Sequence, residues 1–139
     1  MLTAATRMEL ATEDLAHIRG ITDEWVRASL ARDWDALTAM FADDVVFLPP
    51  DAPVVLGKAA VRAFLEGYPP IAAFTATVLS AEGQTEFAWA RGSFAMTVEP
   101  TAGQRISLIG KWAGTYRKRA DGGWLCASDT WNLDAPIGT

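Results

Sequence analysis

Two carboxylates in the sequence, Asp129 and Asp51, could transfer protons. Asp129 shares strand parity with Leu125, Ala127 and Trp131, and such an apolar set is expected to face the interior. Burial raises the pKa of a carboxyl, which is the usual route to a general acid or base near neutral pH. The alternative is a structural role, in which Asp129 accepts a hydrogen bond from a neighbouring backbone or tryptophan N–H. Asp51 lies in a proline-rich loop near the expected pocket mouth, and the alternative is that this loop presents the carboxylate to water.

A second group of residues could bind a small molecule. The chain has 6 tryptophans, whose large apolar rings concentrate in cores, interfaces and ligand pockets. Arg91 shares parity with Phe87 and Trp89, so it could pair with Asp129 or hold an anion, and the alternative is a surface arginine at the end of a strand. Concave, mostly apolar pockets are the usual small-molecule sites, and core packing is the alternative role of these rings. We predict ligand contacts from Trp25, Phe47, Trp89, Arg91, Trp112, Tyr116 and Trp131.

The remaining reactive side chains form no pattern typical of a metal site, a disulfide or a catalytic group. One histidine, His17, and one cysteine, Cys126, cannot supply a zinc site or an internal disulfide. We expect His17 at the surface, and Cys126 on the strand face opposite Asp129. Asp43 and Asp44 are adjacent and point apart, which suits turn hydrogen bonding. We therefore expect no metal and no organic cofactor.

Composition excludes several functional classes. Of the 139 residues, 50% are hydrophobic and 21% are charged, the opposite of a disordered chain. A total of 12 Lys and Arg against 17 Asp and Glu gives a formal net charge of -5, the wrong sign for a nucleic-acid partner. No run approaches the roughly 20 apolar residues of a membrane span, and no signal-peptide pattern opens the sequence. We expect a cytoplasmic protein without nucleic-acid or membrane partners.

Helices in the first half of the chain must position these residues. Apolar side chains at three- and four-residue spacing over residues 15–30 predict a helix that Thr12 caps and that ends near Arg32. Asp33 then starts a short second helix that runs through Phe41.

A short strand and a third helix follow. Residues 45–48 are β-branched or apolar and predict a strand, and residues 49–53 contain three prolines and predict a loop. Gly57 opens a helix over residues 58–66, which Gly67 is expected to close in the left-handed conformation.

Strands in the second half supply most candidate residues. From Ile71 onward the hydrophobic period is 2, with turn signals at residues 82–83, 100–103 and 121–123. This pattern predicts four long antiparallel strands. Helices followed by such a sheet form an α+β domain, which we place at residues 13–134, after a flexible arm (1–12) and before a tail (135–139).

The parity of the strand residues indicates which face is buried. Leu108, Trp112 and Tyr116 share one face, and charged or polar residues alternate with them. Aromatic residues change parity at Gly92 and Ser93, which predicts a β-bulge that curls the sheet.

These motifs resemble the nuclear transport factor 2-like superfamily, which includes ketosteroid isomerases and SnoaL-like polyketide cyclases. The resemblance rests on DWDALTAMFADDVVF at residues 33–47, GK at 57–58, GKW at 110–112, DGGW at 121–124 and DTWN at 129–132. It implies a cone-shaped α+β barrel, with three N-terminal helices packed on a curved, mostly antiparallel sheet of four to five strands. It also implies a homodimer through the sheet.

The residues that ketosteroid isomerases use are absent at the matching positions. Those enzymes combine an aspartate base with a tyrosine and a protonated aspartate at the substrate oxygen. An ungapped alignment places the base at Pro49 and the tyrosine at Trp25, and the second acid falls near Trp112. Steroid isomerisation is therefore disfavoured.

The sequence leaves two functional hypotheses. The first is a protein that binds a small apolar or aromatic molecule and uses Asp129 as general acid or base in a cofactor-independent isomerisation, cyclisation or dehydration. The second is a non-catalytic ligand-binding or dimeric association module with the same fold, because the fold alone does not determine the activity.

Overall fold

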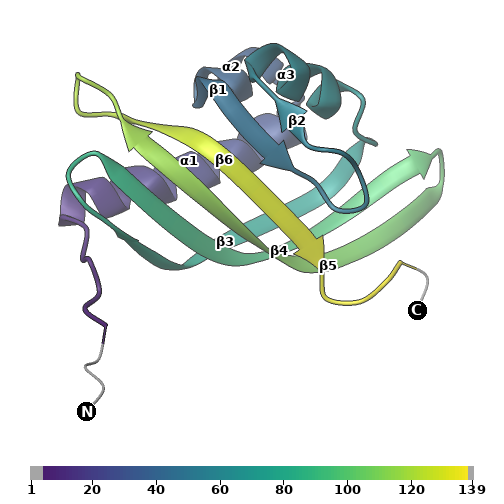
Figure 1. Cartoon of the computed structure of the whole chain (residues 1–139). Helices are drawn as coiled ribbons and strands as arrows, with labels where there is room; N and C mark the ends of the chain where they lie inside the picture. Colours follow the sequence, from purple (N-terminus) through teal and green to yellow (C-terminus); the bar gives the residue numbers. More distant parts are fainter. Residues whose placement is uncertain (1–4, 138–139) are drawn as a thin grey trace.

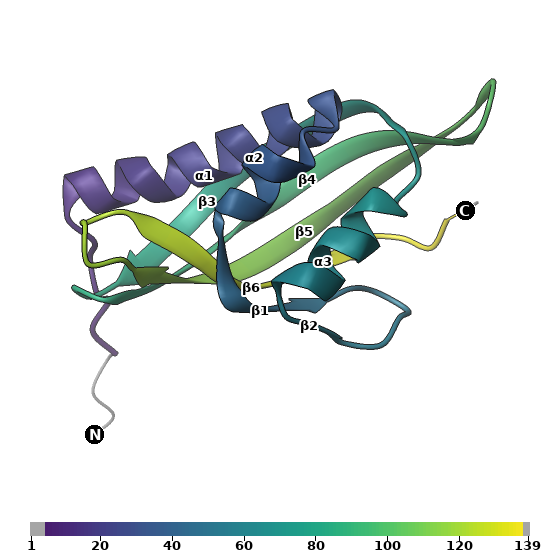
Figure 2. The same ribbon diagram turned by 90° about the horizontal axis from the view of Figure 1, so that it is seen from above.

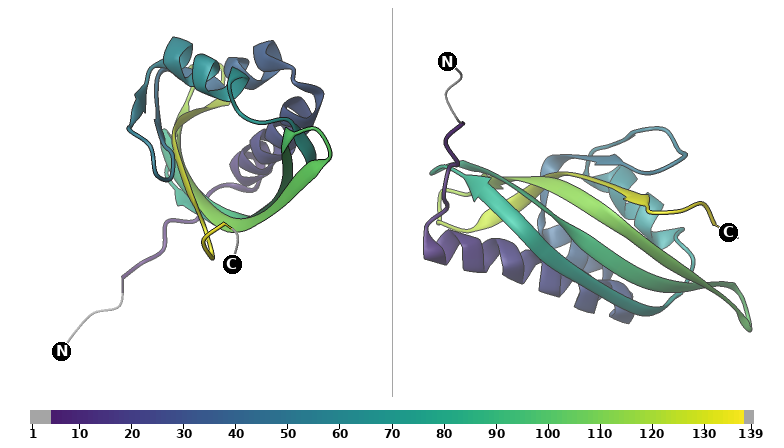
Figure 3. Two further views of the ribbon diagram at one scale, coloured as in Figure 1. Left: turned by 90° about the vertical axis from the view of Figure 1, so that its right-hand side faces the viewer. Right: turned by 90° about the horizontal axis from the view of Figure 1, so that it is seen from below.

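Three helices close the open side of a curled sheet in the computed structural model, which describes residues 5–137 (Figures 1 and 3). The helices are α1 (Thr12–Ala31), α2 (Trp34–Ala39) and α3 (Lys58–Glu66). Helix α1 packs along strand β3 (Ile71–Gly83), and α3 packs against β1 (Phe41–Leu48), as the view from above illustrates (Figure 2). The α+β class predicted from the sequence is confirmed.

The N-cap of α1 differs from the prediction, and the N-cap of α2 agrees with it. Ala11 occupies the N-cap position of α1 without a side-chain hydrogen bond, so Thr12 is the first helical residue rather than the cap. Arg32 ends α1 in the left-handed conformation, with φ of 54°. The Asp33 carboxylate accepts a hydrogen bond from the Ala36 N–H at 3.1 Å, which is the predicted cap of α2.

Strand β1 is longer than predicted. Phe41, expected in the second helix, and both Asp43 and Asp44, expected in a turn, belong to this strand. The Phe41 backbone pairs with Cys126 of β6 (Trp124–Leu133), and its side chain is fully buried. Long-range pairing and burial therefore override the local turn preference of the two aspartates.

The segment after β1 contains one element that the sequence did not predict. Strand β2 (Val55–Leu56) has only two residues and pairs antiparallel with β1. Helix α3 begins after Gly57, whose φ is 89°. Gly67 has a right-handed φ of -84°, so the predicted left-handed cap is wrong. The Gly67 N–H donates to the Ala63 carbonyl and the Tyr68 N–H donates to the Leu65 carbonyl, both at 3.1 Å, so the last turn needs no left-handed residue.

The four long strands form the predicted antiparallel meander, and β1 and β2 extend it to six strands over residues 5–137. The order is β2-β1-β6-β5-β4-β3, and the described pairings are antiparallel except β1 with β6. The predicted count of four to five strands omitted β2. The long strands not yet introduced are β4 (Phe87–Thr101) and β5 (Gln104–Lys118).

The predicted bulge at Gly92 and Ser93 of β4 is wrong. Strand β4 keeps one register with β5 through this region, and the irregularity lies in β3, between Val78 and Ser80. The small residues of β4, including Gly92, face the interior. A Cβ atom at Gly92 would lie 2.7 Å from Nε1 of Trp112, so the indole of β5 occupies the space that this glycine leaves. The aromatic residues at the start of β4 consequently face outward.

One continuous cluster of buried side chains holds the helices to the sheet. It combines buried residues of α1, α2, β1, α3 and the long strands, among them Ile18, Leu37, Phe41, Val45 and Cys126. These side chains are fully buried. Within residues 5–137, none of the helices is long and apolar enough to cross a membrane.

The described part of the predicted N-terminal arm contacts the sheet. Arg7 forms an ion pair with Glu82 at 3.2 Å, and the Met8 carbonyl accepts a hydrogen bond from the Gly83 N–H at 2.8 Å. The ends of the predicted arm and tail, residues 1–4 and 138–139, lie outside the described residues. The domain boundaries stay a prediction.

Candidate functional site

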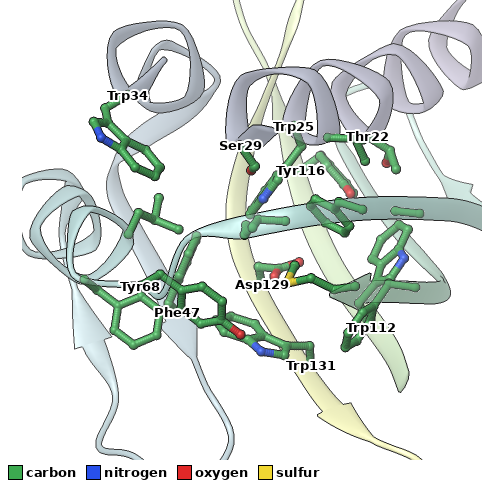
Figure 4. A pocket seen from close by; sticks show the side chains of 18 residues that line it. Thr22, Trp25, Ser29, Trp34, Phe47, Tyr68, Trp112, Tyr116, Asp129 and Trp131 are labelled. Atoms are coloured by element: carbon green, nitrogen blue, oxygen red, sulfur yellow. The ribbon is translucent and has the colours of Figure 1, made fainter. Parts of the chain in front are cut away.

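A cavity of about 100 Å³ lies between the helices and the inner face of the sheet (Figure 4). A space of this size exceeds several-fold the roughly 10–15 Å³ that one water needs. Its wall is mostly apolar and draws side chains from all three helical regions, from β1 and from the long strands. The wall includes Thr22, Trp25, Ser29, Phe47, Trp112, Tyr116, Asp129 and Trp131.

Asp129 faces the cavity because β6 contains a bulge. The register between the strands shifts at Thr115 and Tyr116 of β5, which makes Ala127 the extra residue of β6. The bulge puts Cys126 and Asp129 on the same inner face. The inward position of Asp129 agrees with the prediction, but the regular parity used to derive it does not hold. Cys126 is fully buried in the core, so its predicted position on the opposite face is wrong.

The Asp129 carboxyl is buried and unpaired. The residue is 9% exposed, and the structure gives its side chain no hydrogen bond or ion pair among residues 5–137. In that range, Trp112 Nε1 is the one side-chain nitrogen or oxygen that is fully enclosed and has no hydrogen-bond partner. The Asp129 oxygens have no partner either, so they are not fully enclosed, and they face the cavity. Loss of hydration raises the pKa of Asp129 well above its usual value. The alternative structural role, a bond to a backbone or tryptophan N–H, is not observed in this part of the chain.

Tyr116 presents its hydroxyl beside this carboxyl. Gly114 pairs with Asp129 across β5 and β6, and a Cβ atom at Gly114 would lie 3.2 Å from Tyr116 Oη and 3.4 Å from Asp129 Oδ1. Both oxygens therefore border the space that the glycine leaves open. Burial, with the nearby Cys126 and Asp129, raises the pKa of Tyr116, so its phenol stays a neutral hydrogen-bond donor.

Three predicted ligand-binding aromatics form one wall of the cavity. Trp25 stacks on Phe47, with ring centroids 5.7 Å apart and an interplanar angle of 13°. Phe47 also meets Trp131 edge to face at 5.7 Å. The same rings pack against one another and border the cavity, so core packing and pocket lining are not exclusive. Their ligand-binding role stays a prediction.

Trp112 and Phe47 lie on opposite sides of Asp129 in Figure 4. Its indole lies over Gly92, and its buried Nε1–H has no hydrogen-bond partner among residues 5–137. An unsatisfied buried donor costs about 1–3 kcal/mol, so a tight aromatic fit must offset this loss.

Two hydroxyl groups on α1 also line the cavity, and sequence reasoning missed them. Thr22 and Ser29 are buried, and neither side chain has a hydrogen bond within the described part of the chain. They share one helix face with Trp25 and Val26, at three- and four-residue spacing. That spacing was the signal that could have identified them, because Trp25 was already a predicted pocket residue.

Three predicted site residues lie elsewhere. Trp89 and Arg91 occupy outward positions of β4, because Ala88 and Gly92 take the inward ones. Asp51 is exposed in the loop between β1 and β2, with φ of 55°, and it does not line the cavity. The prediction that Trp89 and Arg91 face the pocket is wrong, and the position of Asp51 gives no support to its predicted catalytic role.

The polar content of the cavity suits proton transfer. Asp129 is the one carboxyl in its described wall, accompanied by the phenol of Tyr116 and the α1 hydroxyls. Among residues 5–137, no group of three or more His, Cys, Asp or Glu side chains is arranged to hold a metal ion. A buried carboxyl with hydroxyl neighbours can exchange a proton with a bound molecule.

Solved structures share this fold at low sequence identity. A ketosteroid isomerase-like protein from Erwinia carotovora atroseptica is 20% identical, with a TM-score of 0.80 over 91% of this chain and 100% of that chain. A conserved protein from Planctomyces limnophilus is 26% identical, with a TM-score of 0.79 over 88% and 99% of the two chains. An NTF2-like protein of unknown function from Pseudomonas putida is 21% identical, with a TM-score of 0.76 over 94% and 99%.

The family follows from the sequence match rather than from these structures. A search among curated proteins finds no match. Residues 22–126, most of the chain, match the family described as SnoaL-like domain. The matched segment runs from the cavity face of α1 to the inner face of β6 and stops three residues before Asp129. The chain therefore belongs to the SnoaL-like domain family, within the nuclear transport factor 2-like superfamily that its motifs resemble.

Proposed function

We propose that this protein binds a small apolar or aromatic molecule in its cavity and that Asp129 exchanges a proton with it. The reaction class is a cofactor-independent isomerisation, cyclisation or dehydration. The observation that carries the proposal is the Asp129 carboxyl, which is buried, unpaired and open to an aromatic-lined cavity. A carboxyl with a raised pKa can give and take a proton near neutral pH.

Each reaction needs only proton movement through Asp129. In isomerisation the ionised carboxylate takes a proton from a carbon beside a carbonyl and returns it to another carbon, so that the double bond moves. In dehydration the neutral carboxyl gives its proton to a leaving hydroxyl, which departs as water, and the carboxylate then takes a proton from the adjacent carbon. In cyclisation the carboxylate takes a carbon-bound proton, and the attacked carbonyl oxygen receives it after the new carbon–carbon bond forms.

Tyr116 supports these steps from the neighbouring strand. Its hydroxyl borders the same space as Asp129 Oδ1, and its raised pKa keeps the proton on oxygen. A neutral phenol can donate a hydrogen bond to an oxygen that gains negative charge when a proton leaves the adjacent carbon. Gly114, which pairs with Asp129 across the two strands, places no side chain beside the two oxygens.

Hydrogen–deuterium exchange tests the proposal without knowledge of the natural substrate. The probe is 2-tetralone, an aromatic ketone, in D2O, with loss of the C1 proton signals followed by NMR. A positioned base contributes about 10²–10⁴-fold, so Asp129→Asn is expected to lose at least about 100-fold of the protein-dependent rate. The matched control is Asp43→Asn, because Asp43 is fully exposed on β1.

The pH profile separates proton transfer from a structural effect of the substitution. Exchange by the wild type should rise with pH until the raised pKa of Asp129 is passed, because only the carboxylate takes a proton. An exchange rate that is equal in wild type and Asp129→Asn would refute the catalytic role. Tight binding of 2-tetralone without any exchange would favour the ligand-binding module instead.

The second candidate function is a dimeric association module. Phe87 and Ile109 occupy outward positions of β4 and β5 and are 50% and 63% exposed. Exposed apolar side chains on one sheet face are typical of an interface between copies of a chain. We propose a homodimer through this face, and light scattering that gives a monomer mass at micromolar concentration would refute it. A cytoplasmic location also stays a prediction.

A further inference from the structure

A second depression, the outer groove, lies on the surface and shares no lining residue with the cavity. It has a volume of about 330 Å³, within the range of roughly 300–1,000 Å³ that is usual for small-molecule sites. Helix α1, the end of α2 and the turn between β5 and β6 form it. Its lining includes His17, Gly20, Ile21, Met40, Arg119 and Trp124.

The floor of the outer groove is apolar and held in place. Ile21 and Trp124 are buried, and Met40 is half-buried. The Trp124 indole N–H donates to Asp14 of α1 at 3.0 Å, and Lys118 Nζ lies 5.7 Å from the centre of the same ring. These contacts fix the ring between α1 and the sheet, so an apolar group can rest on a preformed surface.

Gly20 leaves the α1 side of the groove bare. A glycine inside a helix reduces its stability relative to alanine, because glycine loses more conformational freedom on folding. Gly20 has no positive φ that would require a glycine, and a Cβ atom added to it would meet no atom within 4 Å among the described residues. Neither backbone conformation nor internal packing accounts for this glycine. Its position allows another molecule to contact the helix backbone closely.

Two side chains at the rim have hydrogen-bond donors to spare. His17 Nε2 accepts the Trp124 N–H at 3.3 Å, so the neutral imidazole carries its proton on Nδ1, which has no partner within residues 5–137. Arg119 uses Nη2 for Asp121, and its Nε and Nη1 have no partner in that range. A Cβ atom at Gly123 would lie 3.4 Å from His17 Cε1 and 3.9 Å from Arg119 Cδ, so both side chains flank one gap.

The carboxylates near the groove already have partners. Asp14 accepts from the Trp124 indole and pairs with Lys118 at 3.2 Å, and the Asp121 carboxylate accepts from the Gly123 N–H at 2.9 Å as well as from Arg119. The remaining donors therefore require an acceptor from outside the described chain. A carboxylate suits them, because a guanidinium binds its two oxygens with parallel N–H bonds.

We propose that the outer groove is a second ligand site, which binds small molecules that combine a carboxylate with an apolar group. The carboxylate contacts Arg119 and His17, and the apolar group lies against Gly20 and the floor. This site is independent of the proposed function, because it uses none of the residues that line the cavity.

NMR titration of the whole protein tests both the place and the chemistry of binding. The probes are 1-naphthylacetate and 1-naphthylacetamide, which have nearly the same shape and differ in charge. The acetate should shift the backbone amide signals of Gly20, Ile21 and Leu125, which line the groove. Its Kd should be at least about tenfold lower than that of the amide, because the hydrogen bonds to a carboxylate are charge-assisted.

A matched pair of arginine variants tests the carboxylate contact. Arg119→Gln should weaken acetate binding at least about tenfold. The control is Arg105→Gln, because Arg105 also lies next to a turn between two strands and pairs with an acid, Glu99, at 3.3 Å. Arg105 is outside the groove, so its substitution should change the Kd by less than about twofold.

A leucine at position 20 tests the apolar contact. Gly20→Leu fills the open space and should weaken acetate binding at least about tenfold, whereas Ala31→Leu, at the exposed end of α1, should leave the Kd unchanged. Leucine favours a helix more than glycine does, so the urea midpoint of Gly20→Leu should equal or exceed that of the wild type. Loss of binding in this variant is then not a loss of folding.

Three results would overturn the proposal. The first is that no groove signal shifts at 10 mM acetate, a concentration of about the Kd of a very weak complex. The second is an equal Kd for the acetate and the amide, or for Arg119→Gln and Arg105→Gln. The third is unchanged binding by Gly20→Leu. Shifts confined to Gly114 and Trp131 would place the probe in the cavity, which would overturn the groove site and leave the proposed function standing.

Discussion

The interior of this molecule is solid beside the first half of α1 and hollow beside the second half. Ile18 of α1 and Phe41 of β1 are fully buried in the solid part, where β4 contributes the small side chains of Ala88 and Ala90. The cavity begins at Thr22, one turn farther along α1. There β4 contributes larger side chains instead, which line the space without filling it. The size of the inward residues therefore determines where the helix and sheet leave room for a ligand.

The two parts also differ in how they treat polar groups. Among the described residues, Thr38 of α2 is the buried polar residue outside the cavity wall, and its hydroxyl donates to the Trp34 carbonyl at 2.7 Å. The hollow part retains Asp129 and two unpartnered α1 hydroxyls. Buried polar groups without partners reduce stability, and they are expected where binding rather than stability determines the residue.

The largest predicted effect is a loss of stability when a side chain of the solid part is removed. Phe41→Ala removes a fully buried ring that contacts Trp25 and Phe47, and should lower the free energy of unfolding by about 3–5 kcal/mol. Met96→Ala, at the wall of the existing cavity, should cost clearly less, because its side chain already borders empty space. Urea unfolding followed by tryptophan fluorescence measures both. Equal losses would mean that the cavity wall is packed as tightly as the core.

The next effect concerns the pH dependence of stability at Asp129. Because the folded pKa is raised, the folded state binds the proton more strongly than the unfolded chain does. This contribution is complete below the pKa of an ordinary aspartate and is lost as the pH rises toward the raised folded pKa. Asp129→Asn cannot titrate, so its stability relative to wild type should increase with pH. The increase should be roughly 1.4 kcal/mol for each factor of ten by which folding strengthens proton binding.

Urea unfolding midpoints at pH 4.5 and pH 8 test this prediction. The wild type should lose stability between these values relative to Asp129→Asn. A difference between the two proteins that stays constant with pH would show that Asp129 titrates normally. In that case the carboxyl would be hydrated in solution, and the hollow part would not hold a carboxyl with a raised pKa.

Much of the fold could be predicted because local patterns determine it. The cap at Asp33, the helices and the four long strands follow from short-range chemistry and periodicity. The wrong predictions depend on distant partners. Phe41 joins a strand because β6 lies beside it, and the irregular residue opposite β4 belongs to β3, which parity along one strand cannot reveal.

The candidate site was predicted less completely than the fold. Asp129 was identified, yet the bulge at Ala127 changes the reason why it faces inward. Trp89 and Arg91 were assigned to the wrong face. The prediction took the aromatic residues at the start of β4 to face inward, whereas the alanines between them do so. Thr22 was missed because a hydroxyl on a helix carries no distinctive pattern until its helix face is known.

Gly114→Ala tests whether a ligand oxygen contacts Tyr116 and Asp129 in the hollow part. The added methyl would lie 3.2 Å from the Ser128 carbonyl and Tyr116 Oη and 3.4 Å from Asp129 Oδ1. It should crowd the two side chains that are expected to meet the ligand oxygen, and weaken 2-tetralone binding about tenfold. Stability should change by less than about 1 kcal/mol, because alanine is better than glycine in a strand and offsets the close contact. Unchanged affinity in titration calorimetry would place the ligand oxygen elsewhere.

The smallest effect is expected at a carboxylate of the opposite character. Asp44 is exposed on β1, and the hydrogen bond from Arg117 at 2.8 Å holds the pKa of Asp44 below its usual value. Any stability that it adds is present above the pKa of an ordinary aspartate and is lost as the pH falls, which is opposite in sign to Asp129. Solvent and salt screen such surface pairs, so Asp44→Asn should leave the urea midpoint at pH 8 unchanged within error. The same chemical change at Asp129 and Asp44 therefore isolates burial as the cause. A change in midpoint at Asp44 as large as that at Asp129 would contradict this view.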